Sequence, residues 1–182
     1  MTRETDNKFG MSDMITPIDE LKVQAKKLLK NTDLAKIIPL SANTQHQLKH
    51  TQLYLARQLG FTDWAHAKSI LSCDYDLEAQ NEIQAETQLQ FGSLWHSRKC
   101  DTLLNTWCRN YQEAKQVQSE SGGIILPYKS QYILATADYF TALNIPFEQE
   151  RWQQINNNWC TGDKQIRQQL LLPILIQSRQ TE

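Results

Sequence analysis

The stretch HSRKCDTLLNTWC, from His96 to Cys108, places one histidine and two of the four cysteines of the chain within thirteen positions. These residue types are the ligands of zinc sites and the nucleophile and base of thiol chemistry. On a continuous helix His96 and Cys108 would lie about 18 Å apart along the axis, too far to share one metal ion. The apolar residues of the segment also recur at helical spacing, at Cys100, Leu103, Leu104, Trp107, Cys108 and Tyr111.

That spacing predicts a buried helix in which the two thiols and Trp107 have structural roles, and no metal ion. An enzyme with an unfamiliar site remains the alternative, because His96 and Cys100 would share one helical face and Tyr128 and Lys129 lie together in a predicted turn. The candidate residues of that alternative site are His96, Cys100, Tyr128 and Lys129. No Gly-rich phosphate loop or serine nucleophile elbow occurs, so we assign no catalytic residue and expect no cofactor.

The composition is that of an ordinary globular chain. Of 182 residues, 40% are hydrophobic and 21% charged, and the low counts of 6 Gly and 5 Pro favour helix. No apolar run approaches the roughly 20 residues of a membrane helix, and the polar opening residues lack the apolar core of a signal peptide. We therefore expect a cytoplasmic protein with reduced thiols and no membrane contact.

The pattern predicts a mainly α fold, a helical bundle-like domain with a small two-stranded β-hairpin in its second half. The hairpin signal is IILPYKSQYILAT, two β-rich runs separated by a short polar turn. We expect a flexible leader over residues 1–16, a helical head over 17–72, and a helical region with the hairpin over 73–182, packed with the head as one unit.

A helix corner is predicted within the head. Gly60 follows a helical apolar period and should end that helix with a positive φ, since glycine adopts the left-handed conformation without steric cost. Phe61 should fold back onto the preceding helix, and Trp64 should pack against it. We therefore expect Gly60, Phe61 and Trp64 to have structural roles.

The segment LARQLGFTDWAHAK carries a pattern, Leu-Ala-Arg, two residues, Gly-Phe, two residues, Trp, three residues, Lys. It resembles a helical head segment found in assorted bacterial proteins of unassigned function, including some that are glyoxalase-related. The resemblance covers about residues 48–71. It implies a helix-turn-helix corner and no activity, and it carries over no metal ligand or catalytic residue.

Charge is distributed unevenly along the chain. Residues 21–72 contain eight basic and two acidic residues, whereas residues 73–90 contain five acidic residues and no basic one. Three interpretations fit this contrast. The charges can belong to solvent-exposed helix faces of opposite sign, the acidic segment can be a linker helix between two parts of the chain, or it can lie against the basic head and mask it. The basic head residues that could contact nucleic acid are Lys22, Lys26, Lys27, Lys30, Lys49, Arg57 and Lys68.

Two functional hypotheses follow. The favoured one is a non-enzymatic cytoplasmic regulatory or adaptor protein, whose partner is a protein or, through the basic head, a nucleic acid. The other is the enzyme with a site near His96, Cys100, Tyr128 and Lys129. A reactive thiol would distinguish them, because a catalytic cysteine reacts much faster than buried structural ones.

Overall fold

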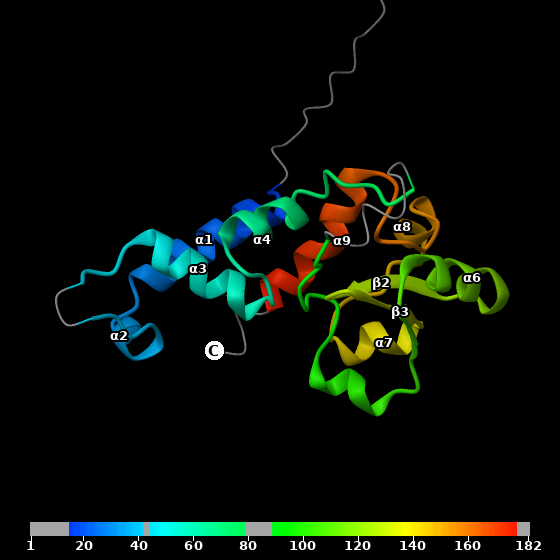
Figure 1. Ribbon diagram of the computed structural model, residues 1–182, viewed down its shortest axis with the longest axis horizontal. Helices are drawn as coiled ribbons and strands as arrows, with labels where there is room; N and C mark the ends of the chain where they lie inside the picture. The colour runs from blue at the N-terminus through cyan, green and yellow to red at the C-terminus, as the bar shows by residue number, and fades with distance from the viewer. Residues whose placement is uncertain (1–14, 42–43, 79–88, 178–182) are drawn as a thin grey trace, which may run out of the picture.

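The computed structural model describes residues 15–41, 44–78 and 89–177. Most of the predicted leader, residues 1–14, lies outside these ranges. Figure 1 shows helices α1 to α4 on one side of the molecule, the small sheet on the other, and α9 between them. The elements in chain order are α1 (Pro17–Leu29), α2 (Leu34–Ile37), α3 (Leu48–Gln58), α4 (Trp64–Leu71), the 3-10 helix η1 (Arg98–Thr102), β1 (Thr106–Cys108), α6 (Tyr111–Ser121), β2 (Ile124–Tyr128), β3 (Gln131–Ala135), α7 (Ala137–Ala142), α8 (Gln149–Gln154) and α9 (Lys164–Gln177).

The helix corner forms as predicted. Gly60 has a φ of +81° and ends α3. The Phe61 amide donates to the Ala56 carbonyl oxygen at 2.9 Å, and its ring is buried in the core. Trp64, the first residue of α4, is half-buried and packs against the same core. The corner thus positions α3 and α4 for packing against α1, as a hydrogen-bonded helix ending does.

The predicted fold class is wrong, because the sheet has a third strand. β2 and β3 form the expected antiparallel hairpin, but β1 pairs with the other side of β3, with Trp107 opposite Ile133. The strand order is β1-β3-β2. Residues 132–135 of the central strand are all buried, as expected when neighbours cover a strand on both sides. The protein is therefore mostly helical with a three-stranded antiparallel sheet, rather than a helical bundle-like domain with a two-stranded hairpin.

The continuous buried helix predicted through the HSRKCDTLLNTWC stretch is also wrong. Helix η1 ends before Leu103, whose backbone is extended with φ −92° and ψ 145°. The Asn105 amide nitrogen Nδ2 donates to the carbonyl oxygens of Cys100, at 3.0 Å, and Leu103, at 3.3 Å. These bonds satisfy carbonyl groups that a longer helix would have used itself, and a side chain that bonds the local backbone in this way competes with helix. The chain then enters β1.

This change of structure moves two apolar side chains to the surface. Leu104 is 107% exposed and Trp107 is 41% exposed, although both were expected on the buried face. Cys100, Cys108 and Tyr111 are buried, as predicted. The residues that were predicted to form one buried helix face therefore lie partly in the core and partly on the surface.

The head and the sheet share one core. The guanidinium of Arg167 on α9 is buried and donates to the carbonyl oxygens of Trp159, at 2.7 Å, and Tyr75, at 2.6 Å. Gly92 lies against the helix corner, and its carbonyl oxygen accepts from the Lys129 amide at 2.7 Å. These two residues connect segments that are remote in sequence. Among the helices of the described residues, none is long and apolar enough to cross a bilayer.

Candidate functional site

Three aromatic rings surround His96, and they come from three different elements. The ring centroid of His96 lies 5.4 Å from Trp107 on β1, 4.9 Å from Tyr128 at the end of β2, and 6.4 Å from Tyr139 on α7. Trp107 and Tyr128 also contact each other, with centroids 5.5 Å apart. We call His96, Asp101, Trp107, Tyr128 and Tyr139 the His96 cluster.

Both ring nitrogens of His96 have hydrogen-bond partners. Nδ1 lies 2.9 Å from the Tyr139 hydroxyl, and Nε2 lies 3.0 Å from Oδ1 of Asp101. The Tyr139 hydroxyl also donates to the carbonyl oxygen of Trp95 at 2.9 Å. A carbonyl oxygen and a carboxylate only accept, so the Tyr139 hydroxyl can accept from Nδ1 while it donates to Trp95, and Nε2 can donate to Asp101. The tautomer of His96 determines which ring nitrogen donates.

A general base needs a nitrogen within hydrogen-bond reach of the substrate proton. In this structure both His96 nitrogens lie within hydrogen-bond distance of protein groups. Burial raises the pKa of the Tyr139 hydroxyl, and the nearby Cys100 thiol adds to this effect, so Tyr139 stays a neutral hydrogen-bonding group. The hydrogen bonds within the cluster hold its side chains in place.

The alternative-site residues lie near one another, but they do not form a nucleophile and its base. Cys100 is completely buried, and its Sγ contacts Ser97 Oγ at 3.7 Å rather than His96. Lys129 is exposed in the β2–β3 turn, with a φ of +52° and Nζ 5.2 Å from the Tyr128 ring centroid. Of the four candidates, His96 and Lys129 each lie beside Tyr128, whereas the thiol of Cys100 is buried.

Two members of the His96 cluster were not predicted from the sequence. Asp101 follows His96 by five residues, so the two would not share one face of the continuous helix that the sequence predicts. Tyr139 belongs to a segment that reads only as an amphipathic helix, and its approach to His96 depends on the long-range packing of α7 against η1. The pairing of β1 with β3, which the sequence did not indicate, brings Trp107 beside His96 and Tyr128.

The basic head residues are exposed, and two acidic residues in the described part of the acidic segment pair with lysines outside the head; the rest of that segment, residues 79–88, lies outside the described residues. Asp74 pairs with Lys164 on α9, and Glu78 pairs with Lys115 on α6 at 3.2 Å. Lys22 pairs with Asp19 of its own helix at 2.9 Å. Within the described ranges, no ion pair involves the other basic head residues, Lys26, Lys27, Lys30, Lys49, Arg57 and Lys68.

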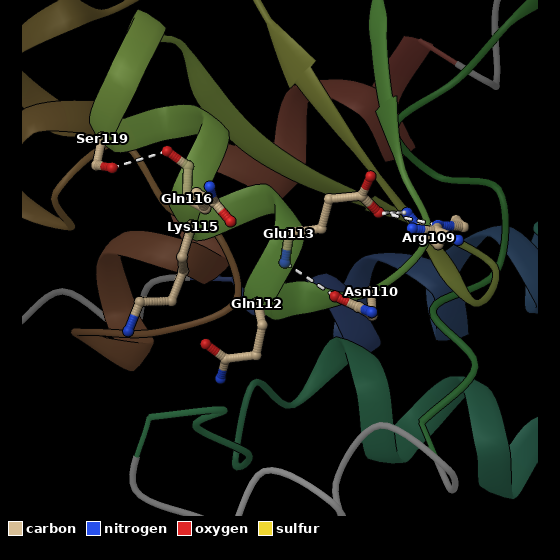
Figure 2. A pocket seen from close by; sticks show the side chains of 7 residues that line it. All are labelled: Arg109, Asn110, Gln112, Glu113, Lys115, Gln116 and Ser119. Atoms are coloured by element: carbon tan, nitrogen blue, oxygen red, sulfur yellow. Dashed lines mark hydrogen bonds and ion pairs between the residues drawn. The ribbon is translucent and has the colours of Figure 1, made fainter.

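A shallow hollow lies over the outer face of α6 (Figure 2). Seven polar residues between Arg109 and Ser119 line it. Asn110 caps the helix by accepting from the Glu113 amide at 2.9 Å, and the Glu113 carboxylate accepts from the Arg109 amide at 2.7 Å. The lining residues thus bond one another in the manner of an ordinary helix N-terminus. Across the parts of the chain described, no three His, Cys, Asp or Glu residues gather as a metal site.

Comparison with known proteins does not assign the chain to a family. No protein-family model matches the chain, and no curated protein or solved structure does so either. Functional inference therefore depends on the residues themselves.

Thiol labelling should detect no fast-reacting cysteine. All four thiols are buried, burial raises the pKa of Cys73 to about 11, and burial also raises the pKa of Cys108 and Cys160. A pKa of about 11 leaves about 100-fold less thiolate at Cys73 near pH 8 than an ordinary cysteine has, and burial shields the other three thiols from the reagent, so we expect labelling of the native chain to be much slower than that of the unfolded chain. Labelling with Ellman's reagent, with and without denaturant, measures the ratio. One native thiol that reacts as fast as an unfolded one would favour the enzyme hypothesis.

Proposed function

We propose that the protein is a non-enzymatic regulatory or adaptor protein of the cytoplasm that binds another protein through Leu104 and Trp107. The observation that carries the proposal is the exposure of these two large apolar side chains, three positions apart in the sequence, at 107% and 41%. Aromatic residues are enriched in protein interfaces, and grouped apolar exposure marks binding surfaces. We call Leu104 and Trp107 the β1 surface.

The contacts that hold Trp107 in place strengthen the proposal. The Trp107 ring packs against His96 and Tyr128, whose side chains are fixed by the hydrogen bonds and ring contacts of the His96 cluster. A rigid aromatic side chain loses little conformational entropy on binding, so such residues are effective anchors. The same hydrogen bonds occupy both nitrogens of His96, which weighs against the enzyme hypothesis.

A second candidate function is nucleic-acid binding by the head. It is favoured by the pairing of Asp74 and Glu78 with lysines outside the head, which leaves Lys26 and Lys27 exposed on one face of α1. A DNA duplex should then bind at about 50 mM salt, weaken as salt rises, and be lost with the Lys26→Glu, Lys27→Glu double substitution. Absence of binding at low salt would exclude this second function.

Site-directed photo-cross-linking in the native host tests the first proposal. A photoreactive amino acid at position 104 should give discrete covalent adducts with a partner protein, and Trp107→Ala should reduce them by about 10-fold, as loss of an aromatic anchor does. Val23, which is 41% exposed on α1, provides the matched control position because it is another exposed apolar residue far from β1. Equal adducts at positions 104 and 23, or none at 104, would contradict the proposal.

A further inference from the structure

Among the described residues, no strand pairs with the outer edge of β1, unlike the opposite edge of the sheet. Beside β2, the Ile125 amide donates to the Asn157 carbonyl oxygen at 2.9 Å, and the Trp159 amide donates to the Ile125 carbonyl oxygen at 3.1 Å. Beside β1, the described residues supply no backbone hydrogen bond to Thr106 or Trp107 other than those within the sheet. An unpaired edge presents amide and carbonyl groups that another strand can use.

The segments that adjoin β1 carry three basic residues. Arg98 and Lys99 lie on η1, which precedes β1 in the chain, and Lys129 lies in the β2–β3 turn beside Tyr128, whose ring contacts Trp107 of β1. Within the described structure none of the three forms an ion pair. The nearby acidic groups already have partners, since Asp101 contacts His96 at 3.0 Å and Glu113 contacts Arg109 at 3.4 Å. The edge therefore complements a segment with negative charge.

We propose that an extended acidic segment of the partner protein binds beside β1 as a fourth antiparallel or parallel strand. This inference rests on the proposed function and specifies its partner. Main-chain bonds to the open edge would provide affinity, Arg98, Lys99 and Lys129 would select acidic side chains, and Leu104 and Trp107 would contact the apolar ones. Side chains of a strand alternate, so a segment in which acidic and apolar residues alternate fits best.

The ring geometry favours a peptide over a single-stranded nucleic acid. Stacking of bases needs aromatic faces open to the solvent. Here the rings of Trp107 and Tyr128 meet at 82°, those of His96 and Trp107 at 73°, and those of His96 and Tyr128 at 66°, so the rings pack on one another edge to face. The fully exposed Leu104 provides an aliphatic contact that suits a peptide side chain.

Fluorescence anisotropy with defined probes and the full chain tests the inference. The probes are labelled peptides (Glu-Val)4, (Lys-Val)4 and (Glu-Pro)4 and the oligonucleotide (dT)12. We expect binding of (Glu-Val)4 alone, because (Lys-Val)4 reverses the charge and (Glu-Pro)4 keeps the charge but lacks the donors for strand pairing. The Arg98→Glu, Lys99→Glu variant should bind (Glu-Val)4 at least about 10-fold more weakly.

The control is Lys26→Glu, Lys27→Glu, which makes the same charge change on α1 and should alter (Glu-Val)4 binding less than about 2-fold, as long-range charge effects are screened by salt. Equal binding of (Glu-Pro)4 would overturn strand pairing, and preferred binding of (dT)12 would replace the peptide by a nucleic acid. If no peptide binds while position 104 still cross-links a protein, the strand inference fails and the proposed function stands. If both measurements fail, the β1 surface is not a binding site.

Discussion

Arg167→Ala should lower the free energy of unfolding by about 3 to 5 kcal/mol, in the range found when one partner of a buried polar network is removed. Nε of Arg167 donates to the Trp159 carbonyl oxygen, and Nη1 donates to that of Tyr75 and, at 3.4 Å, to that of Cys73. The guanidinium also lies 4.3 Å from the Tyr75 ring centroid. The substitution would leave buried carbonyl groups without donors and would remove a cation from an aromatic face.

Urea unfolding of the variant measures this loss, and Lys164→Ala is its matched control. Lys164 lies one turn earlier on α9 and pairs with Asp74 at the surface, so its removal should cost at most about 1 kcal/mol. A loss for Arg167→Ala no larger than the loss for Lys164→Ala would mean that Arg167 does not join α9 to the segment after the head.

Gly92→Ala should cost about 2 to 4 kcal/mol, from the combined cost of a left-handed alanine and of overpacking. Gly92 has a φ of +67°, and a Cβ there would lie 2.5 Å from the Leu59 carbonyl oxygen and 2.9 Å from the Phe61 ring. The Leu59 oxygen accepts from the Ser93 amide at 2.8 Å, so it cannot withdraw without losing that bond. The helix corner and the β2–β3 turn would have to separate.

Gly122→Ala is the control that separates the cost of the positive φ from the cost of the steric contact at Gly92. Gly122 has a φ of +74° but no atom within 4 Å of its added Cβ, so only the backbone conformation is penalised, by about 1 kcal/mol. Thermal or urea unfolding of both variants gives the comparison. Equal losses at the two glycines would show that the segments around Gly92 do not meet as closely as described.

Local signals were sufficient to predict the ends of several elements. Gly60 ends α3 with the expected positive φ. The hairpin of β2 and β3 was predicted from β-rich runs around a short turn, and the structure confirms that pairing. Each of these features depends on residues that are close in sequence, where backbone preferences and caps decide the outcome.

The errors occurred where distant contacts decide the structure. The helical spacing from Cys100 to Tyr111 predicted one buried face, yet the pairing of Thr106–Cys108 with β3 stabilises a strand and exposes Trp107. Asn105 was the one local signal against a continuous helix, because its side-chain amide donates to two preceding carbonyl oxygens. The His96 cluster could not be predicted in full, because Tyr139 reaches His96 only through the packing of α7.

Amide hydrogen exchange of the protein bound to the partner captured through position 104 tests the central proposal most directly. Exchange reports local opening and protection segment by segment, so it identifies the surface that the partner covers. We expect new protection across η1 and β1, residues 98–108, and unchanged exchange over Pro17–Leu29 of α1. Protection of α1 with unchanged exchange over residues 98–108 would place the partner on the basic head and would contradict the proposed role of the β1 surface.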